Sequence, residues 1–418
     1  MGKVFLLRLS LLNNLQLKKA ALVGVLCLDV VLMQPQAHAL EEDVIRPYVN
    51  VSYTYDDNIR RFNNKARAQL LTGSSNLSDT VLTTGVGIIL DKQISQQRIF
   101  VDFNINKSKY DRNSALDNNA KEMTGRWDWK VGRRWDGKFE LYHKEAMVPF
   151  TDFFTNDPRA LSLNTRTSDR RLIEARWMMH PRWRLRGAVV NYEIEYSADI
   201  QKAANLEENS QELSLDYLSP SKSIVGILYR QVKGNKPEQI FLGALISNDY
   251  AQNEWKLNID WAITGKTKVQ FLGGVVDRQH EQLSSRDFRG VNLRGNFSWV
   301  PTGKTDLRWM VWRENNAQSF VTTSYTLNQG SSVTASWIAT EKVMLQGSLR
   351  YEKRDFEGDA IFGQLRSDKD KSAMVSLIYK PISSFRFNAS FIHSSRDSSS
   401  DVFGFKSNSV SLSGQYEF

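Results

Sequence analysis

Hydrophobic residues recur at every second position in many short runs of this chain. In one run, Trp255, Leu257, Ile259 and Trp261 alternate with lysine, asparagine and aspartate. Because successive side chains of a strand point to opposite faces, the pattern predicts strands with one apolar face and one polar face. Such runs are long enough for a tilted transmembrane strand of about 9 to 11 residues. Further runs span 99–106, 291–299 and 385–391.

Short turn signals, such as 264–266 and 301–304, separate these runs at intervals of about 36 to 47 residues. Each interval contains two alternating runs joined by a longer polar stretch, which gives the unit strand, tight turn, strand, long loop. Eight tight turns and nine long loops connect about 18 strands, with 16 as the alternative count. The sequence therefore predicts an all-β fold. It is a transmembrane antiparallel up-and-down β-barrel with short periplasmic turns and longer extracellular loops.

Aromatic residues give a second, independent indication of a membrane barrel. Many tryptophans lie near the tight turns, whereas several tyrosines lie nearer the long loops, and two such bands are typical of bilayer interfaces. The alternative is core packing in a β-sandwich, which would scatter tryptophans along the strands. The tryptophans near turns are Trp135, Trp177, Trp183, Trp261, Trp299 and Trp337. The tyrosines near loops are Tyr55, Tyr110, Tyr196 and Tyr351.

Residues 1–39 are predicted to be a secretory signal peptide, which leaves 40–418 as a single outer-membrane β-barrel domain. A basic start precedes an apolar stretch from Ala20 to Met33, and Ala37-His38-Ala39 matches a cleavage site. The alternative is an N-terminal membrane anchor, but a run of about 14 residues is short for a span of about 20. The one cysteine, Cys27, lies in this segment, so the mature chain is expected to form no disulfide.

The last nine residues, V-S-L-S-G-Q-Y-E-F, continue the alternation to the end of the sequence. We expect this segment to be the closing strand of the barrel, paired with the first strand near Tyr48 to Tyr55. Aromatic residues at Tyr416 and Phe418 resemble the closing-strand signal that the outer-membrane assembly machinery reads.

The stretch P-Y-V-N-V-S-Y-T-Y-D-D-N-I, from Pro47 to Ile59, resembles the start of exopolysaccharide-operon outer-membrane barrels. These EpsL-type proteins are grouped with β-barrel porin family 2. The resemblance implies a role in assembling or exporting an extracellular polysaccharide, with the polymer as substrate and periplasmic export proteins as partners. It implies no catalytic residues.

A barrel of about 18 strands is wide enough to hold water, so function should depend on inward side chains. Cations exceed anions among the inward positions that the alternation picks out, which would favour anionic solutes. The alternative is that these charges pair with one another and stiffen the wall. The lumen-facing candidates are Lys130, Tyr142, Lys144, Arg176, Arg184, Arg186, Lys256, Arg294, Arg308, Arg350 and Arg386.

The stretch from Met147 to Arg166 is among the longest connections, and by count it follows the fifth strand. It contains apolar residues, which are unusual in a wet loop unless they pack against something. We hypothesise that this loop narrows the channel, with an external loop packed on its neighbours as the alternative. The constriction-loop candidates are Asp152, Phe153, Phe154 and Asp157.

Enzymatic, metal-binding and nucleic-acid-binding functions have little support in the sequence. The histidines of the mature chain form no metal-ligand pair, and basic residues are dispersed along strands rather than clustered. His143 and His280 could join a Ser-His or Asp-His pair near a rim, as in barrel hydrolases. We predict no enzyme, no metal, no cofactor and no nucleic-acid partner.

The sequence therefore predicts an outer-membrane channel of a Gram-negative bacterium that takes part in exopolysaccharide biosynthesis or export. Besides the polymer and the assembly machinery, membrane lipid and lipopolysaccharide are the expected partners. The alternative function is a porin for passive diffusion of small anionic solutes.

Overall fold

The computed structural model describes most of the chain after the N-terminal segment. The described residues are 44–152, 162–221, 223–241, 244–282, 284–320, 323–358 and 366–418. The predicted signal peptide, residues 1–39, lies outside the described residues and stays a prediction.

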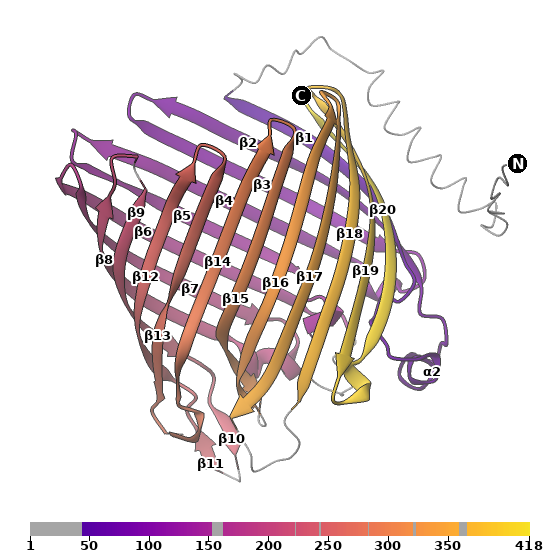
Figure 1. The fold of residues 1–418 in the computed structure, drawn as a ribbon. Helices are drawn as coiled ribbons and strands as arrows, with labels where there is room; N and C mark the ends of the chain where they lie inside the picture. The colour runs from indigo at the N-terminus through magenta and orange to yellow at the C-terminus, as the bar shows by residue number, and fades with distance from the viewer. Residues whose placement is uncertain are drawn as a thin grey trace, which may run out of the picture.

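The chain forms one closed antiparallel barrel of 18 strands, which confirms the predicted fold class (Figure 1). The first nine strands are β1 Ile45–Asp56, β2 Asp79–Ile94, β3 Gln97–Tyr110, β4 Asn118–Val131, β5 Trp135–Met147, β6 Thr165–His180, β7 Trp183–Tyr196, β8 Leu206–Leu218 and β9 Ile224–Asn235. The other nine are β12 Tyr250–Thr264, β13 Thr267–His280, β14 Phe288–Thr302, β15 Thr305–Phe320, β16 Thr323–Thr340, β17 Val343–Gly358, β18 Ser367–Ile382, β19 Phe385–Ser398 and β20 Phe405–Glu417.

Short turns gather at one rim of the barrel, and most of the longer connections lie at the other (Figure 1). The loop rim carries the small hairpin of β10 Gln239–Phe241 and β11 Ala244–Ile246, and the helix α2 Lys65–Thr72. Asn64 caps α2 by accepting from the Arg67 backbone nitrogen at 2.8 Å, and Gly73 ends it with φ of +75°. None of the helices in the described ranges is long and apolar enough to cross a membrane.

The first and last strands close the barrel. β1 pairs with β20 from Tyr48 opposite Glu417 to Asp56 opposite Ser409. The backbone nitrogen of Phe418 also donates to the Pro47 carbonyl at 2.9 Å. Closure leaves no unpaired sheet edge, which is a requirement for strands that cross a lipid bilayer.

The outer face of the barrel is an apolar band. Leu349 and Val375, for example, are 65% and 60% exposed, which would be costly in water but is favourable against lipid. Near the tight turns, the outward rings of Trp135 and Trp177 stack with their centroids 5.7 Å apart. This arrangement suits a membrane interface, where indole is apolar with a polar edge.

The tyrosines near the loops do not all belong to the outer face. Tyr55 and Tyr351 are exposed there, as a band would require. Tyr110, in contrast, is in register with buried Val81, and Tyr196 is in register with Arg166 on the inner face. The prediction that these two tyrosines join an interfacial band is therefore wrong, because their strand parity turns them inward.

The apolar phase of the sequence changes within β7, near Val190, which predicts a bulge or an incorrect strand boundary. The structure shows neither, since β7 pairs with β8 without a register shift from Trp183 to Ile194. Instead, Ala188 and Val190 point inward and pack on Leu172 of β6 in a small buried cluster. The inner wall thus contains a local apolar patch. The polar-apolar alternation of the β7 sequence changes because these inward residues pack together, and not because the strand has a bulge.

Candidate functional site

Strand register divides the wall into two faces. Positions in register with the exposed apolar residues face outward, and the alternate positions face the lumen. The alternate, lumen-side positions include Lys130, Tyr142, Lys144, Arg176, Arg184, Arg186, Lys256, Arg294, Arg308, Arg350 and Arg386. Lys130 lies opposite Asp136 and Arg386 opposite Gln415.

A ladder of alternating charges crosses the inner wall from β5 to β12. At its start Arg176 contacts Asp136, and its Nε lies 3.6 Å from Glu174. Arg186 then bridges Glu174 at 2.7 Å and Glu212 at 2.8 Å. Each of these two arginines thus lies between two carboxylates, and at least one of the two comes from a neighbouring strand.

The same ladder continues over the next three strands. Arg230 lies 3.6 Å from Glu212 and 3.7 Å from Glu254, and Lys256 contacts Glu254 at 2.5 Å. Since Glu254 is only 2% exposed, its charge depends on these partners. This half of the wall is a neutralised, rigid network.

Inward cations on other strands are also paired. Arg184 contacts Asp216 at 2.7 Å, Lys144 contacts Glu122 at 3.0 Å, and Arg294 contacts Glu314 at 2.7 Å. The Tyr142 hydroxyl donates to Glu122 at 3.1 Å and so joins the Lys144 pair. Pairing of this kind was the stated alternative to a free cationic lining.

Two further arginines complete the set. Arg308 contacts Asp306 at 3.0 Å, close to a tight turn. Arg350 contacts Glu352 at 2.7 Å and covers the Trp312 ring at 4.3 Å, while the Trp312 indole donates to the same carboxylate at 2.9 Å. Arg354 Nε also donates to Glu352 at 2.9 Å, so three groups from β15 and β17 hold this carboxylate.

Sequence reasoning missed many of the acidic partners. Glu212 and Asp216 alternate with Leu213 and Leu215 on β8, so alternation alone could have placed them inward. The excess of inward cations in the sequence prediction came partly from leaving out such carboxylates. Across most of the wall, the described charges are close to balanced.

A different environment occurs inside the loop rim, at β9, β12, β13 and the loops beside them. The Arg278 guanidinium covers the Tyr250 ring at 4.3 Å, and its Nε donates to Gln252 at 2.7 Å. Arg278 is only 4% exposed, and its Nη1 has no hydrogen-bond partner within the described residues. The Tyr250 hydroxyl donates to Glu208, which positions the ring beneath the guanidinium.

Two more cations lie close to Arg278. Lys236 follows β9, and Arg286 lies in the β13–β14 loop, where it is buried and bonded to the Asn248 side chain. The pKa of Lys236 falls to about 7 because burial disfavours its charged form and the nearby Arg278 and Arg286 repel it, more than Glu208 compensates. We call Lys236, Arg278 and Arg286 the rim cluster; it creates a positive potential at the loop end.

The structure describes only the ends of the predicted constriction loop. Phe150 packs on Leu116 of the neighbouring loop and on Met147, and the Arg60 guanidinium lies 5.6 Å from its ring centre. Asp152 ends a short 3-10 helix that starts at Phe150. The candidates Phe153, Phe154 and Asp157 lie outside the described residues. A role in narrowing the channel therefore stays a prediction.

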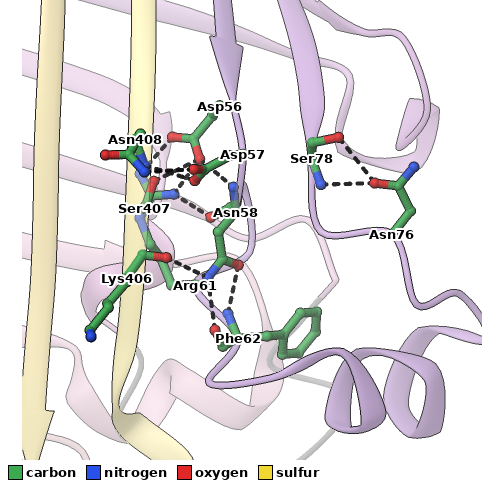
Figure 2. Close-up of polar contacts among 10 residues, drawn as sticks. All are labelled: Asp56, Asp57, Asn58, Arg61, Phe62, Asn76, Ser78, Lys406, Ser407 and Asn408. Atoms are coloured by element: carbon green, nitrogen blue, oxygen red, sulfur yellow. Dashed lines mark hydrogen bonds and ion pairs between the residues drawn. The ribbon is translucent and has the colours of Figure 1, made fainter.

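The Asp56-Asp57-Asn58 motif ties β1 to β20 (Figure 2). Asp56 accepts from the Asn58 backbone nitrogen and the Ser407 hydroxyl, both at 2.8 Å. Asn58 donates to the Phe62 carbonyl at 2.7 Å and to the Lys406 carbonyl at 2.9 Å. The motif that carries the family resemblance thus holds the loop end of the closing seam.

The closing-strand residues lie at the opposite rim. The rings of Tyr416 and Phe418 form an edge-to-face pair with centroids 5.0 Å apart. How the assembly machinery would read them stays a prediction.

Two histidines have carboxylate partners. His143 Nδ1 lies 2.8 Å from Asp169, and His280 Nδ1 lies 3.5 Å from Asp287. Among the described residues no serine hydroxyl is bonded to either imidazole, so these pairs provide no positive evidence of catalysis. The same residues contain no group of three or more metal-ligating side chains.

Comparison with known proteins gives a partial family match and a broader likeness of fold. The family model "Putative beta-barrel porin 2" matches residues 258–418, less than half of the chain. No curated protein sequence matches the chain. The match supports the porin part of the resemblance, whereas the EpsL-type assignment is not confirmed.

Several solved structures are similar to this chain over most of its length. OccK2 of Pseudomonas aeruginosa is similar with a TM-score of 0.50 and 11% identity, over 91% of this chain and 99% of that one. OccAB3 of Acinetobacter baumannii has a TM-score of 0.44 and 12% identity, over 90% and 99% of the two chains. At 11% identity the likeness to OccK2 shows the fold alone.

The closed barrel, its apolar outer band and the family match define the class of protein. The chain is a porin-like β-barrel of the Gram-negative outer membrane.

Proposed function

We propose that this barrel is a channel for passive diffusion of small anionic solutes. The observation that carries the proposal is the rim cluster, in which buried Arg278 and Arg286 lie near Lys236; burial first, and then repulsion by these two arginines, lowers the pKa of Lys236. A positive potential at a channel entrance concentrates anions and repels cations.

The rest of the inner wall suits this role because it is nearly neutral. The ladder from Asp136 to Lys256 pairs each cation with a carboxylate, so a solute that has passed the rim meets a polar surface without a deep trap. Conduction requires binding that is strong enough for entry and weak enough for release. In this proposal the rim cluster selects anionic solutes, and the charge ladder lines the path along which they diffuse.

Ion selectivity in planar bilayers tests the proposal. With a salt gradient across the membrane, the reversal potential should indicate anion preference for the purified barrel. Glucuronate, the anion with which OccK2 has been solved, is a suitable organic probe when compared with uncharged glucose. A barrel that does not conduct, or that prefers cations, would rule the proposal out.

The exopolysaccharide role has less support. It depends on the resemblance at Pro47 to Ile59, and the partial family match and the fold favour a porin-like channel. Deletion of the gene separates the two functions. Loss or trapping of surface polysaccharide would favour the polymer role, and slow growth on an anionic nutrient with an intact capsule would favour the porin.

A further inference from the structure

The outer wall carries a groove across β16, β17 and β18. It is lined by Val333, Leu349, Tyr351, Ala373, Lys371 and His393. Val333, Leu349, Ala373 and His393 form one cross-strand row, because each is in register with the next. The small side chain of Ala373 beside exposed Leu349 leaves a depression on an apolar face.

A group of lysines borders this groove toward the loop rim. Lys371 and Lys406 lie on either side of Ser395 in one cross-strand row, about 10 Å apart by the usual strand spacing. Lys369 lies two residues from Lys371 on the same face and is in register with Asp397. We call Lys369, Lys371 and Lys406 the lysine patch.

One carboxylate serves these three cations. Lys371 contacts Asp397 at 3.0 Å, and Lys369 and Lys406 also act on the same carboxylate electrostatically. The side chains of Lys371 and Asp397 are 54% and 60% exposed, so the pair is loose and open to another partner. Among the described residues, the outward positions of β18, β19 and β20 at this rim therefore carry more positive than negative charge.

The opposite side of the barrel differs at the same rim. There Asp169, Glu193 and Glu207 form a cross-strand row of carboxylates on the outer face. The outer face of β18 to β20 at this rim is therefore more positive than the outer face of β6 to β8, and a phosphate would favour the former. Long loops lie on the extracellular side of outer-membrane barrels, so the patch is at the level of the outer-leaflet headgroups.

We propose that the outer face of β16 to β20 binds the phosphorylated glycolipid of the outer leaflet, lipopolysaccharide. A phosphate of its lipid anchor lies against the lysine patch, and one acyl chain lies in the groove between Leu349 and His393. Lys371 belongs to both parts, so headgroup and chain are held by one continuous surface. This binding is independent of the solute that the channel conducts.

Binding of a fluorescent lipid A to the detergent-solubilised barrel tests the proposal. The triple variant K369Q/K371Q/K406Q should weaken binding at least about tenfold, since a juxtamembrane lysine contributes severalfold each. The matched control is K107Q/K109Q/K121Q, which removes three outward lysines on β3 and β4, none of which lines the groove. Heat-modifiable migration on gels verifies that every variant remains a folded barrel.

Two further arms separate the lipid from other sources of phosphate and from general charge attraction. Ala373→Leu fills the groove without altering the lysines, and it should weaken binding about threefold or more. Inorganic phosphate should not compete at millimolar concentration. The proposal fails if both lysine triples weaken binding equally, if dephosphorylated lipid A binds as well, or if Ala373→Leu has no effect.

Discussion

The Asp57 carboxylate accepts two hydrogen bonds from Asn408, one from its backbone nitrogen at 2.7 Å and one from its side-chain amide at 2.8 Å. The backbone nitrogen of Asp57 donates in return to the Asn408 carbonyl at 3.0 Å. These residues are separated by most of the chain, yet they meet where the barrel closes. The Asp-Asp-Asn motif is therefore a structural clasp for the seam.

Asn58→Ala should destabilise the barrel by about 1–3 kcal/mol. Asn58 is 3% exposed and bonds to backbone groups of Phe62 and Lys406; alanine would remove these bonds and leave the two buried Phe62 groups without this partner. The urea midpoint of the barrel in lipid vesicles measures the effect. Asn76→Ala is the control, since the Asn76 side chain is exposed and accepts two hydrogen bonds from Ser78 in the same loop (Figure 2). Equal urea midpoints for the two variants would contradict the conclusion that this motif stabilises the closing seam.

Much of the architecture followed from the sequence because strand parity is a local property. Alternation at Trp255, Leu257 and Ile259 predicts which side chains meet lipid, and the fold bears it out. Turn spacing gave 18 strands because each hairpin repeats the same unit. Parity failed where inward apolar residues pack together, as Leu172 and Val190 do.

Partners across the wall could not be read from the sequence in the same way. The contact of Arg186 with Glu212 depends on the register of β7 with β8, and a slip by one residue would turn every side chain to the other face. The rim cluster was missed for a similar reason. Lys236 and Arg286 lie in loops, where alternation gives no information.

Glu174→Gln should destabilise the barrel on the order of 3 kcal/mol, because it removes the carboxylate that joins Arg176 and Arg186 in a buried ladder. Glu174 is 6% exposed, so water cannot replace the lost partner fully. Asp306→Asn is the matched control. It breaks the pair with Arg308, whose side chain is 69% exposed, and should cost about 0–1 kcal/mol. If the control proves equally destabilising, the ladder contributes no special stability.

Anion preference should fall as pH rises from 6 to 8. Lys236 has a pKa of about 7, mainly because of burial and then because of Arg278, so its positive charge is present below pH 7 and is lost above it. Reversal potentials measured along a pH series would show the change. Lys236→Arg keeps its charge over this range and should remove the pH dependence. If the pH dependence persists in Lys236→Arg, a titrating group other than Lys236 causes it.

Gly330→Ala should destabilise the barrel by about 1–3 kcal/mol, the usual range for overpacking. A Cβ at Gly330 would lie 2.3 Å from Trp312 Cζ2 and 2.6 Å from the Tyr351 carbonyl oxygen, which belongs to the backbone. The ring cannot move freely, since its indole donates to Glu352 at 2.9 Å and Arg350 covers its face.

Gly187→Ala is the control for this close approach, because a Cβ there meets nothing within 4 Å. Both glycines lie within strands and have ordinary backbone angles, so the two changes lose similar chain entropy and differ only in contacts. Tryptophan fluorescence during urea unfolding reports the midpoint of each variant. Gly187→Ala should leave the midpoint unchanged or raise it slightly. If Gly330→Ala also leaves the urea midpoint unchanged, the Trp312 ring can move to accept the added methyl group. The contacts of Trp312 with Glu352 and Arg350 would then not hold this part of the inner surface in place.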